Sequence, residues 1–163
     1  MRWTLKPKPD SKKTANLATK LGVDKAIAEL LLQRGIESFE DAKTFFRPSW
    51  SDLHDPFLMK DMDKAVARIE SAIKNNEQIL VFGDYDVDGT TAVSLVSSYL
   101  KTIYSNIATY IPDRYAEGYG VSYKGIDFAH DNDFSLIIAL DCGIKSIDHV
   151  NYAAEKGIDF IIC

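Results

Sequence analysis

Apolar residues recur at three- and four-residue spacing over residues 14–46, a pattern that predicts α-helices. Gly35 is placed to end one of these helices. Ser38, with Asp41 three residues later, is the expected N-terminal cap of the next. This helical region is expected to stop at Pro48, because a proline disfavours the helical conformation of the residue before it.

The prolines and lysines of the first 13 residues predict an extended lead-in. A connector rich in turn residues and aromatics, PSWSDLHDPFLM, follows the helical region. After it, MDKAVARIESAIKNN carries its apolar residues on one helical face and predicts an amphipathic helix. We therefore expect a basic lead-in with a helical segment over residues 1–56, and a second domain over residues 57–163.

From Asn76 onward the pattern changes to alternating strands and helices. The predicted strands are QILVFG, IATYIP, SLIIALD and IDFIIC, and the helices between them are TTAVSLVSSYLKTIY, YKGIDFAHDN and SIDHVNYAAEKG. Short, almost wholly apolar strands are typical of a sheet that is covered on both faces, and the alternation indicates parallel strands with right-handed crossovers. The predicted fold class is α/β, a Rossmann-like parallel sheet with helices on both faces. We expect this sheet to be incomplete, because nothing follows its last strand.

The composition indicates in which part of the cell the protein is expected. The chain has 163 residues, of which 46% are hydrophobic and 26% charged, as in ordinary globular proteins. It has no apolar run of the ~20 residues that a membrane helix needs, and its N-terminus has no signal-peptide pattern. Two cysteines, Cys142 and Cys163, form no disulfide framework. We expect a cytoplasmic protein without a membrane partner.

The string DYDVDG places Asp84, Asp86 and Asp88 between a predicted strand and a predicted helix. It matches the opening of a calcium-binding EF-hand loop, but that loop needs a glutamate at its twelfth position, which is Leu95 here. The residues Asp86 to Thr90 also match the nucleophile motif of haloacid-dehalogenase-type phosphatases. Those enzymes need a serine or threonine at the end of a following strand, which neither IATYIP nor SLIIALD provides. The phosphatase remains an alternative.

A metal site is the third interpretation. Clustered carboxylates repel one another unless a cation compensates them, and hard oxygen ligands suit Mg²⁺ or Mn²⁺. The carboxyl ends of parallel strands meet at one edge, where ligands bind. The strand SLIIALD brings Asp141 to that edge, and IATYIP brings Asp113 and Arg114. A simpler role is also open for each residue, since Asp88 before Gly89 is a suitable helix cap.

Three segments in order, GDYDVDG (83–89), IPDRYAEGYGVS (111–122) and LDCGI (140–144), resemble the first motifs of the DHH phosphoesterase family, specifically its single-strand-specific exonucleases. In these enzymes the Asp-His-His motif follows the next strand, here DFIIC. Manganese pyrophosphatases of the same superfamily carry a metal-binding histidine four residues before the first ligand aspartate. Phe82 stands there, which favours the nuclease branch.

The resemblance implies an enzyme that hydrolyses single-stranded DNA from its 5′ end in DNA repair and recombination. It implies two divalent cations, Mn²⁺ or Mg²⁺, as cofactors, and allows a single-strand-binding protein as a partner. Asp86, Asp88 and Asp141 are carried over as catalytic metal ligands, with Asp84 as a further ligand or a neighbour of one. We expect residues 1–163 alone to be inactive, because the histidine pair would lie beyond them.

The second motif implies contacts with the DNA strand. Arg114 is expected to bind phosphate, Tyr119 to stack on a base, and Gly118 and Gly120 to let the backbone approach the strand closely. Ser122, at the end of the motif, is also expected to belong to this DNA-binding group. Two further functions stay open within the family, a phosphodiesterase of small nucleotides and a DNA-binding protein without catalysis.

Overall fold

The computed structural model describes residues 3–163, which form two units divided between Leu58 and Met59. The helices of the first unit are α1 (Ser11–Leu21), α2 (Lys25–Leu32) and α3 (Phe39–Phe46), followed by two short 3₁₀ helices, η1 (Trp50–Asp52) and η2 (Pro56–Leu58). Leu17, Ala28 and Leu31 are the centre of the small core that these α-helices share. The predicted helical N-terminal segment is therefore present.

The extended lead-in is shorter than its prolines suggest. The first helix already begins at Ser11, because the Asp10 side chain accepts hydrogen bonds from the backbone N–H groups of Lys12 and Lys13, at 2.8 and 2.9 Å. An aspartate at this position satisfies amide groups that the helix leaves without partners. The expectation of extended structure up to residue 13 is wrong from residue 11 onward, and its residues 1–2 lie outside the described residues.

The predicted start of α3 is confirmed. The backbone N–H of Asp41 donates to the Ser38 hydroxyl at 3.0 Å, and the N–H of Ser38 donates to the Asp41 carboxylate at 3.2 Å. This is the reciprocal capping box that the sequence indicated. Gly35 has φ of 80°, a left-handed conformation suited to the end of a helix, and follows α2 as expected.

The second unit is an α/β domain. Its elements are α4 (Met62–Lys74), β1 (Gln78–Gly83), α5 (Val87–Lys101), β2 (Ile107–Tyr110), α6 (Tyr123–Asp131), β3 (Phe134–Leu140), α7 (Ile147–Glu155) and β4 (Asp159–Ile162). All four strands pair in parallel, in the order β2-β1-β3-β4. The predicted fold class is confirmed. None of the helices in the described part of the chain is long and apolar enough to cross a membrane.

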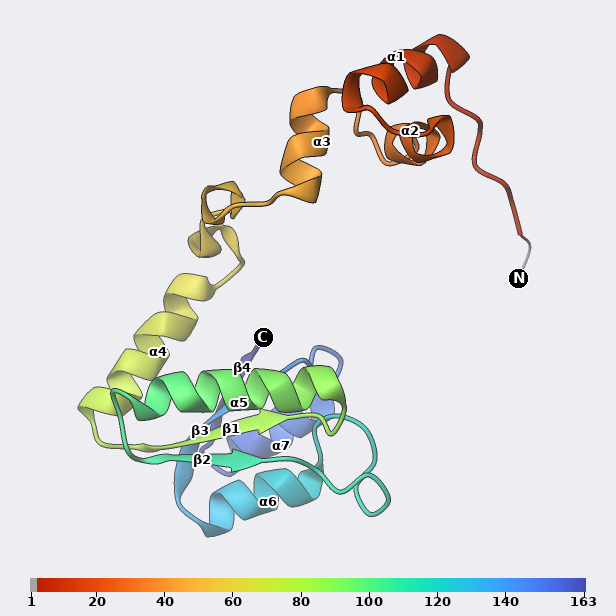
Figure 1. Ribbon diagram of the computed structural model, residues 1–163. Helices are drawn as coiled ribbons and strands as arrows, with labels where there is room; N and C mark the ends of the chain where they lie inside the picture. The colour runs from red at the N-terminus through yellow and green to blue at the C-terminus, as the bar shows by residue number, and fades with distance from the viewer. Residues whose placement is uncertain (1–2) are drawn as a thin grey trace. The chain divides into compact units, whose positions relative to one another are not determined.

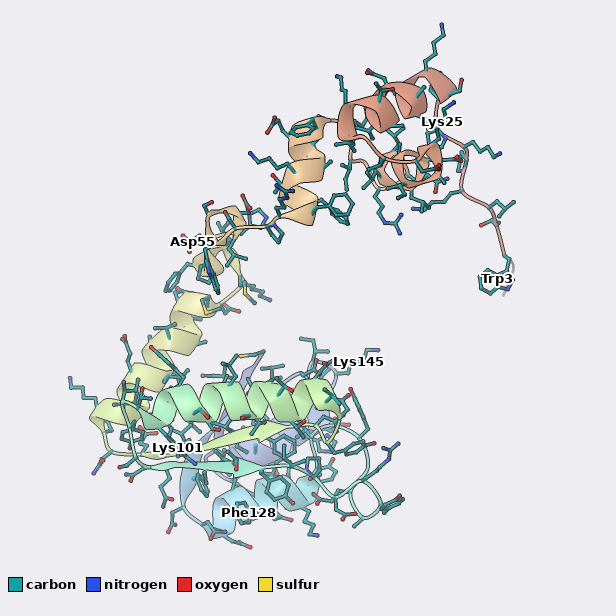
Figure 2. The ribbon with its side chains drawn as sticks, in the orientation of Figure 1. Trp3, Lys25, Asp55, Lys101, Phe128 and Lys145 are labelled. Carbon is teal, nitrogen blue, oxygen red and sulfur yellow. The ribbon has the colours of Figure 1, made fainter. Side chains whose placement is uncertain are left out.

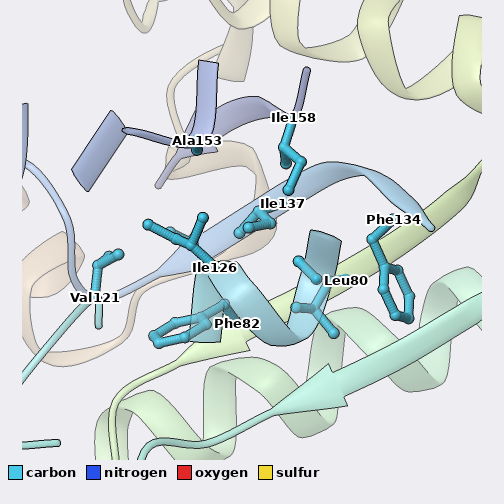
Figure 3. Packing of buried hydrophobic residues seen from close by; sticks show 10 residues of the cluster. Leu80, Phe82, Val121, Ile126, Phe134, Ile137, Ala153 and Ile158 are labelled. Atoms are coloured by element: carbon cyan, nitrogen blue, oxygen red, sulfur yellow. The ribbon is translucent and has the colours of Figure 1, made fainter. Parts of the chain in front are cut away.

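Helices cover both faces of the sheet (Figure 1). On one face, Ala72 of α4 and Val93 of α5 pack on alternate residues of β1, among them Ile79. On the other face, Ile126 of α6 and Ala153 of α7 pack on the intervening residues of β1 and on β3 (Figure 3). Each fully buried aliphatic or aromatic side chain contributes about 1.5–3 kcal/mol to folding. This two-sided burial explains why the strands read as continuous apolar runs.

The strand order places a switch point at β1. The chain goes from β1 to β2 on one side, and then crosses to β3 on the other side of β1. In open parallel sheets, such a reversal leaves a crevice outside the carboxyl ends of the two strands concerned. Here these are the ends of β1 and β3, where the sequence places Asp84 and Asp141.

Candidate active site

Asp84 follows β1 directly, and its side chain is fully buried. Its Oδ1 accepts a hydrogen bond of 3.3 Å from the backbone N–H of Gly120, whereas its Oδ2 is buried without a partner. An ionised carboxylate in such a place is costly unless a cation or further donors compensate it. The orphaned oxygen of Asp84 fits a divalent cation, for which carboxylate oxygens are suitable ligands.

Two glycines allow the end of β1 and the start of α5 to pack closely. A Cβ at Gly89 would lie 2.5 Å from the backbone oxygen of Asp84, and a Cβ at Gly83 would lie 2.3 Å from Cγ2 of Val93. Both positions are buried. The first turn of α5, with the positive end of the helix dipole, therefore lies directly against Asp84.

Asp86 is the N-terminal cap of α5. Its Oδ1 accepts a hydrogen bond of 2.9 Å from the N–H of Gly89, and the helix begins at Val87. The suggestion that Asp88 is the cap is wrong, because the helix starts three residues earlier than its apolar pattern indicated. Asp88 lies in the first turn and is exposed. Its carboxylate is thus free of the capping role.

Asp141 lies at the same edge of the sheet. β1 and β3 pair Gly83 with Leu140, so that Asp84 and Asp141 are the next residues of the two strands. The backbone of Asp141 has φ of 55°, in the left-handed region that a non-glycine residue adopts only at some cost. Its side chain is exposed. The strained turn comes directly at the carboxyl end of β3.

Two side chains near the carboxyl edge, Tyr119 and Cys142, have pKa values that are raised in part by the charges of the same three aspartates. The charge of Asp84, and then those of Asp86 and Asp141, raise the pKa of Tyr119. Burial raises the pKa of the Cys142 thiol to about 11, and the same three charges add to this effect. Within residues 3–163, no three His, Cys, Asp or Glu side chains are arranged closely enough to enclose a metal ion. The acidic groups thus share one region without forming a closed set of ligands.

The loop over residues 111–122 brings the predicted DNA-binding residues to this region. The Arg114 guanidinium lies 5.1 Å from the centre of the Tyr85 ring, and the Tyr119 ring meets Tyr85 edge-on at 5.9 Å. Gly118 and Gly120 have φ of 85° and 86°, a left-handed conformation in which glycine is favoured. Tyr85, a residue that the sequence analysis did not single out, is therefore the contact between Arg114 and Tyr119.

Asp113 and Ser122 have local partners. The Asp113 Oδ1 accepts hydrogen bonds from the N–H groups of Tyr115 and Ala116, at 2.9 and 2.8 Å, which lower its pKa. The sequence analysis placed Asp113 with the other aspartates. In the structure its carboxylate is instead bound within its own turn. Ser122 is buried and caps α6, since its hydroxyl oxygen accepts the N–H of Gly125 at 3.0 Å.

Sequence reasoning missed Glu117, whose side chain is only 4% exposed. It accepts hydrogen bonds from the hydroxyls of Ser122 (2.6 Å) and Tyr110 (2.9 Å) and from the N–H of Asp113 (2.9 Å). Burial alone would raise the pKa of Glu117, but these hydrogen bonds hold it below its usual range. Burial and the neighbouring Glu117 raise the pKa of Tyr110 to about 12. The one sequence signal for Glu117 is its position inside the second motif, residues 111–122.

Residues 78–163 match the model of the DHH family, N-terminal domain. The chain belongs to the DHH family. This membership decides against the haloacid-dehalogenase-type phosphatase, and the strand-loop-helix geometry around Asp84 decides against an EF-hand. The three motifs on which the resemblance rested all lie within the matched region.

The chain is similar to exonucleases. The chain is 38% identical over 162 residues to the single-stranded-DNA-specific exonuclease RecJ of Bacillus subtilis, covering 99% of this chain and 20% of that protein. It is 30% identical over 139 residues to RecJ of Escherichia coli, covering 83% of this chain and 23% of that protein. The chain thus spans about a fifth of the length of these relatives.

Solved structures agree in fold. An exonuclease RecJ bound to manganese matches with a TM-score of 0.58 and 31% identity, over 64% of this chain and 27% of that one. RecJ of Thermus thermophilus in complex with Mn²⁺ matches with a TM-score of 0.70 over 99% of this chain and 22% of that one. Because the identity is 23%, the second match is evidence for the fold alone.

Proposed function

We propose that the chain is the N-terminal part of a metal-dependent exonuclease that degrades single-stranded DNA from the 5′ end. The buried, unpartnered Oδ2 of Asp84 carries this proposal, since it lies at the switch point of the sheet with the charges of Asp86 and Asp141 close by. The relatives of the chain, which are single-stranded-DNA-specific exonucleases, supply the substrate class.

The ligands that we propose for Mn²⁺ or Mg²⁺ are Asp84, Asp86, Asp88 and Asp141. When bound, such ions act as Lewis acids toward a phosphate oxygen and lower the pKa of a bound water. Asp84 is held in place by the N–H of Gly120, and Asp86 by its capping bond to Gly89. These contacts orient two of the four carboxylates before a cation arrives, whereas binding has to bring the full set of ligands together.

The loop residues are proposed to hold the DNA strand. Arg114 is exposed and is steadied by the Tyr85 ring, so that its guanidinium can pair with a phosphate through two hydrogen bonds. Tyr119 is 66% exposed, which leaves its ring accessible to a base. Gly118 presents backbone without a side chain, whereas Gly120 is buried and contributes through its N–H, which donates to Asp84. Ser122 contributes through the fold of the loop, because its hydroxyl already has protein partners.

A nuclease assay on the full-length protein tests this function. We expect Mn²⁺-dependent loss of nucleotides from the 5′ end of labelled single strands, little cleavage of duplexes, and no activity after chelation or in Asp141→Asn. Cleavage from the 3′ end, or activity that survives chelation, would contradict the proposal. Efficient hydrolysis of dinucleotides without activity on longer strands would instead indicate the small-nucleotide phosphodiesterase.

Residues 1–163 alone are proposed to be inactive. The described residues contain no group of three candidate ligands close enough to enclose a metal ion. Measurable Mn²⁺-dependent degradation of 5′-ended strands by the purified 163-residue chain would refute this proposal while leaving the exonuclease proposal intact.

A further inference from the structure

We propose that Glu117 is the positioning residue of the active site, a buried carboxylate that holds the loop over residues 111–122 in its DNA-binding form. The inference rests on the proposed nuclease function for its kinetic consequences, but not for its structural ones. Glu117 touches none of the candidate metal ligands. It acts through the residues that it orders.

The contacts of Glu117 join both ends of the loop. Its Oε2 accepts the hydroxyl of Tyr110, the last residue of β2, and the hydroxyl of Ser122, the cap of α6. Its Oε1 accepts the N–H of Asp113 and lies 4.0 Å from the Lys124 ammonium. An ionised carboxylate offers about four acceptor positions and no donor, which matches a site where every neighbour is a donor.

The loop closes on itself around this residue. The Asp113 carboxylate accepts two N–H groups of the turn that follows it, the N–H of Glu117 donates to the Asp113 carbonyl at 2.9 Å, and the Glu117 carboxylate accepts the N–H of Asp113 in return. This reciprocal arrangement is the loop counterpart of a capping box. It fixes the backbone between the two points at which the loop contacts residues 84 and 85, directly after β1.

Those two points carry the proposed chemistry. Before Glu117, Arg114 lies over the ring of Tyr85. After it, the N–H of Gly120 donates to Asp84 across a sequence separation of 36 residues. Consecutive Cα atoms are about 3.8 Å apart, so that Gly120 can lie no more than about 11 Å from Glu117. A loop freed from Glu117 would lose the donor to Asp84 and the position of Arg114 together.

The test compares Glu117→Gln with Glu155→Gln in the full-length protein. Glu155 is an exposed glutamate at the end of α7, so that its variant controls for the loss of one negative charge. A glutamine has one acceptor oxygen, and its amide group would face donors on the other side. We therefore expect amide exchange in the peptide 111–122 to accelerate at least about tenfold in Glu117→Gln, while exchange in β1 and β3 stays unchanged.

Steady-state kinetics give the second readout. Because the loop holds the strand, KM for 5′-ended single strands should rise by about 10- to 100-fold in Glu117→Gln, with a smaller change in kcat. Unchanged exchange in 111–122, or a fall in activity that merely follows a lower melting temperature, would overturn the proposal. If the unmodified protein degrades no DNA, the nuclease assignment fails, and the exchange measurement still decides whether Glu117 holds the loop.

Discussion

The carboxylates at the two edges of the sheet have different surroundings. At the amino edge, Arg68 of α4 donates to Glu77 at 2.7 Å and to Asp159 at 2.6 Å, and Ser135 donates to Glu77 as well. At the carboxyl edge, Asp84 is fully buried, and one of its oxygens has no partner. Carboxylates at the first edge are neutralised by the fold, whereas Asp84 at the second has no cation beside it within the described residues.

This difference distinguishes the ion-paired Glu77 from Asp84, a proposed metal ligand, better than their sequence context does. Glu77 precedes β1 and Asp84 follows it, so that both flank the same buried strand. The guanidinium that reaches Glu77 also lowers its pKa, after the larger effect of the Ser135 hydrogen bond. No comparable cation neutralises Asp84 within the described residues, and the hydrogen bond that it accepts from the N–H of Gly120 brings no full charge. Figure 2 shows that Lys101 and Lys145 lie at opposite ends of the sheet.

The largest expected effect separates the two roles of Asp86. Asn is as good a helix cap as Asp but lacks the charge that a divalent cation requires. We expect Asp86→Asn in the full-length protein to lose several orders of magnitude in nuclease rate, with a melting temperature close to that of the unmodified protein. Asp86→Ala should lose the same activity and in addition about 1 kcal/mol of stability. Activity retained in Asp86→Asn would return this residue to a purely structural role.

The next effect contrasts the two edges directly, through the free energy of unfolding in the absence of metal. Arg68→Met leaves Glu77 and Asp159 without their cation and should destabilise the protein by about 2 kcal/mol. Asp84→Asn removes a buried uncompensated charge, so that the metal-free protein should be at least as stable as before. Urea unfolding in the presence of a chelator measures both. A large loss of stability in Asp84→Asn would mean that the fold itself neutralises this carboxylate.

The smallest effect is the pH dependence of the amino edge. The pKa of Glu77 in the folded chain lies below its ordinary value of 4.5, because of the hydrogen bond from Ser135 and then the contacts with Arg68. The folded state therefore binds fewer protons, and the stabilisation is present above pH 4.5 and lost as the pH falls through the lowered pKa. The stability difference between the unmodified protein and Glu77→Gln should shrink over that interval. A constant difference down to about pH 3 would contradict this assignment.

The sequence predicts most of the fold because its signals are local. The alternation after Asn76 and the continuous apolar runs of β1 and β3 indicate a parallel sheet, and its carboxyl edge then follows for Asp84 and Asp141. The cap formed by Ser38 and Asp41 is equally local. The sequence places the starts of two helices too late. Asp10 and Asp86 each begin a helix earlier than the apolar pattern does.

The remainder of the site depends on contacts that no periodicity encodes. The hydrogen bond from Gly120 to Asp84 spans 36 residues, and the two elements that Glu117 joins, β2 and α6, are separated by irregular backbone. The close approach of Gly89 to Asp84 is visible only once α5 is placed on the sheet. The motif strings mark these residues, but their roles come from the geometry.

The central claim is that the carboxyl edge is a metal site, and a Mn²⁺ titration of the full-length protein tests it most directly. Calorimetry or electron paramagnetic resonance would count the bound ions in the unmodified protein, in Asp84→Asn and in Asp141→Asn. The account predicts up to two ions per chain in the first, and a loss of at least one ion or of at least about tenfold in affinity in each variant. Equal stoichiometry and equal affinity in all three proteins would contradict it.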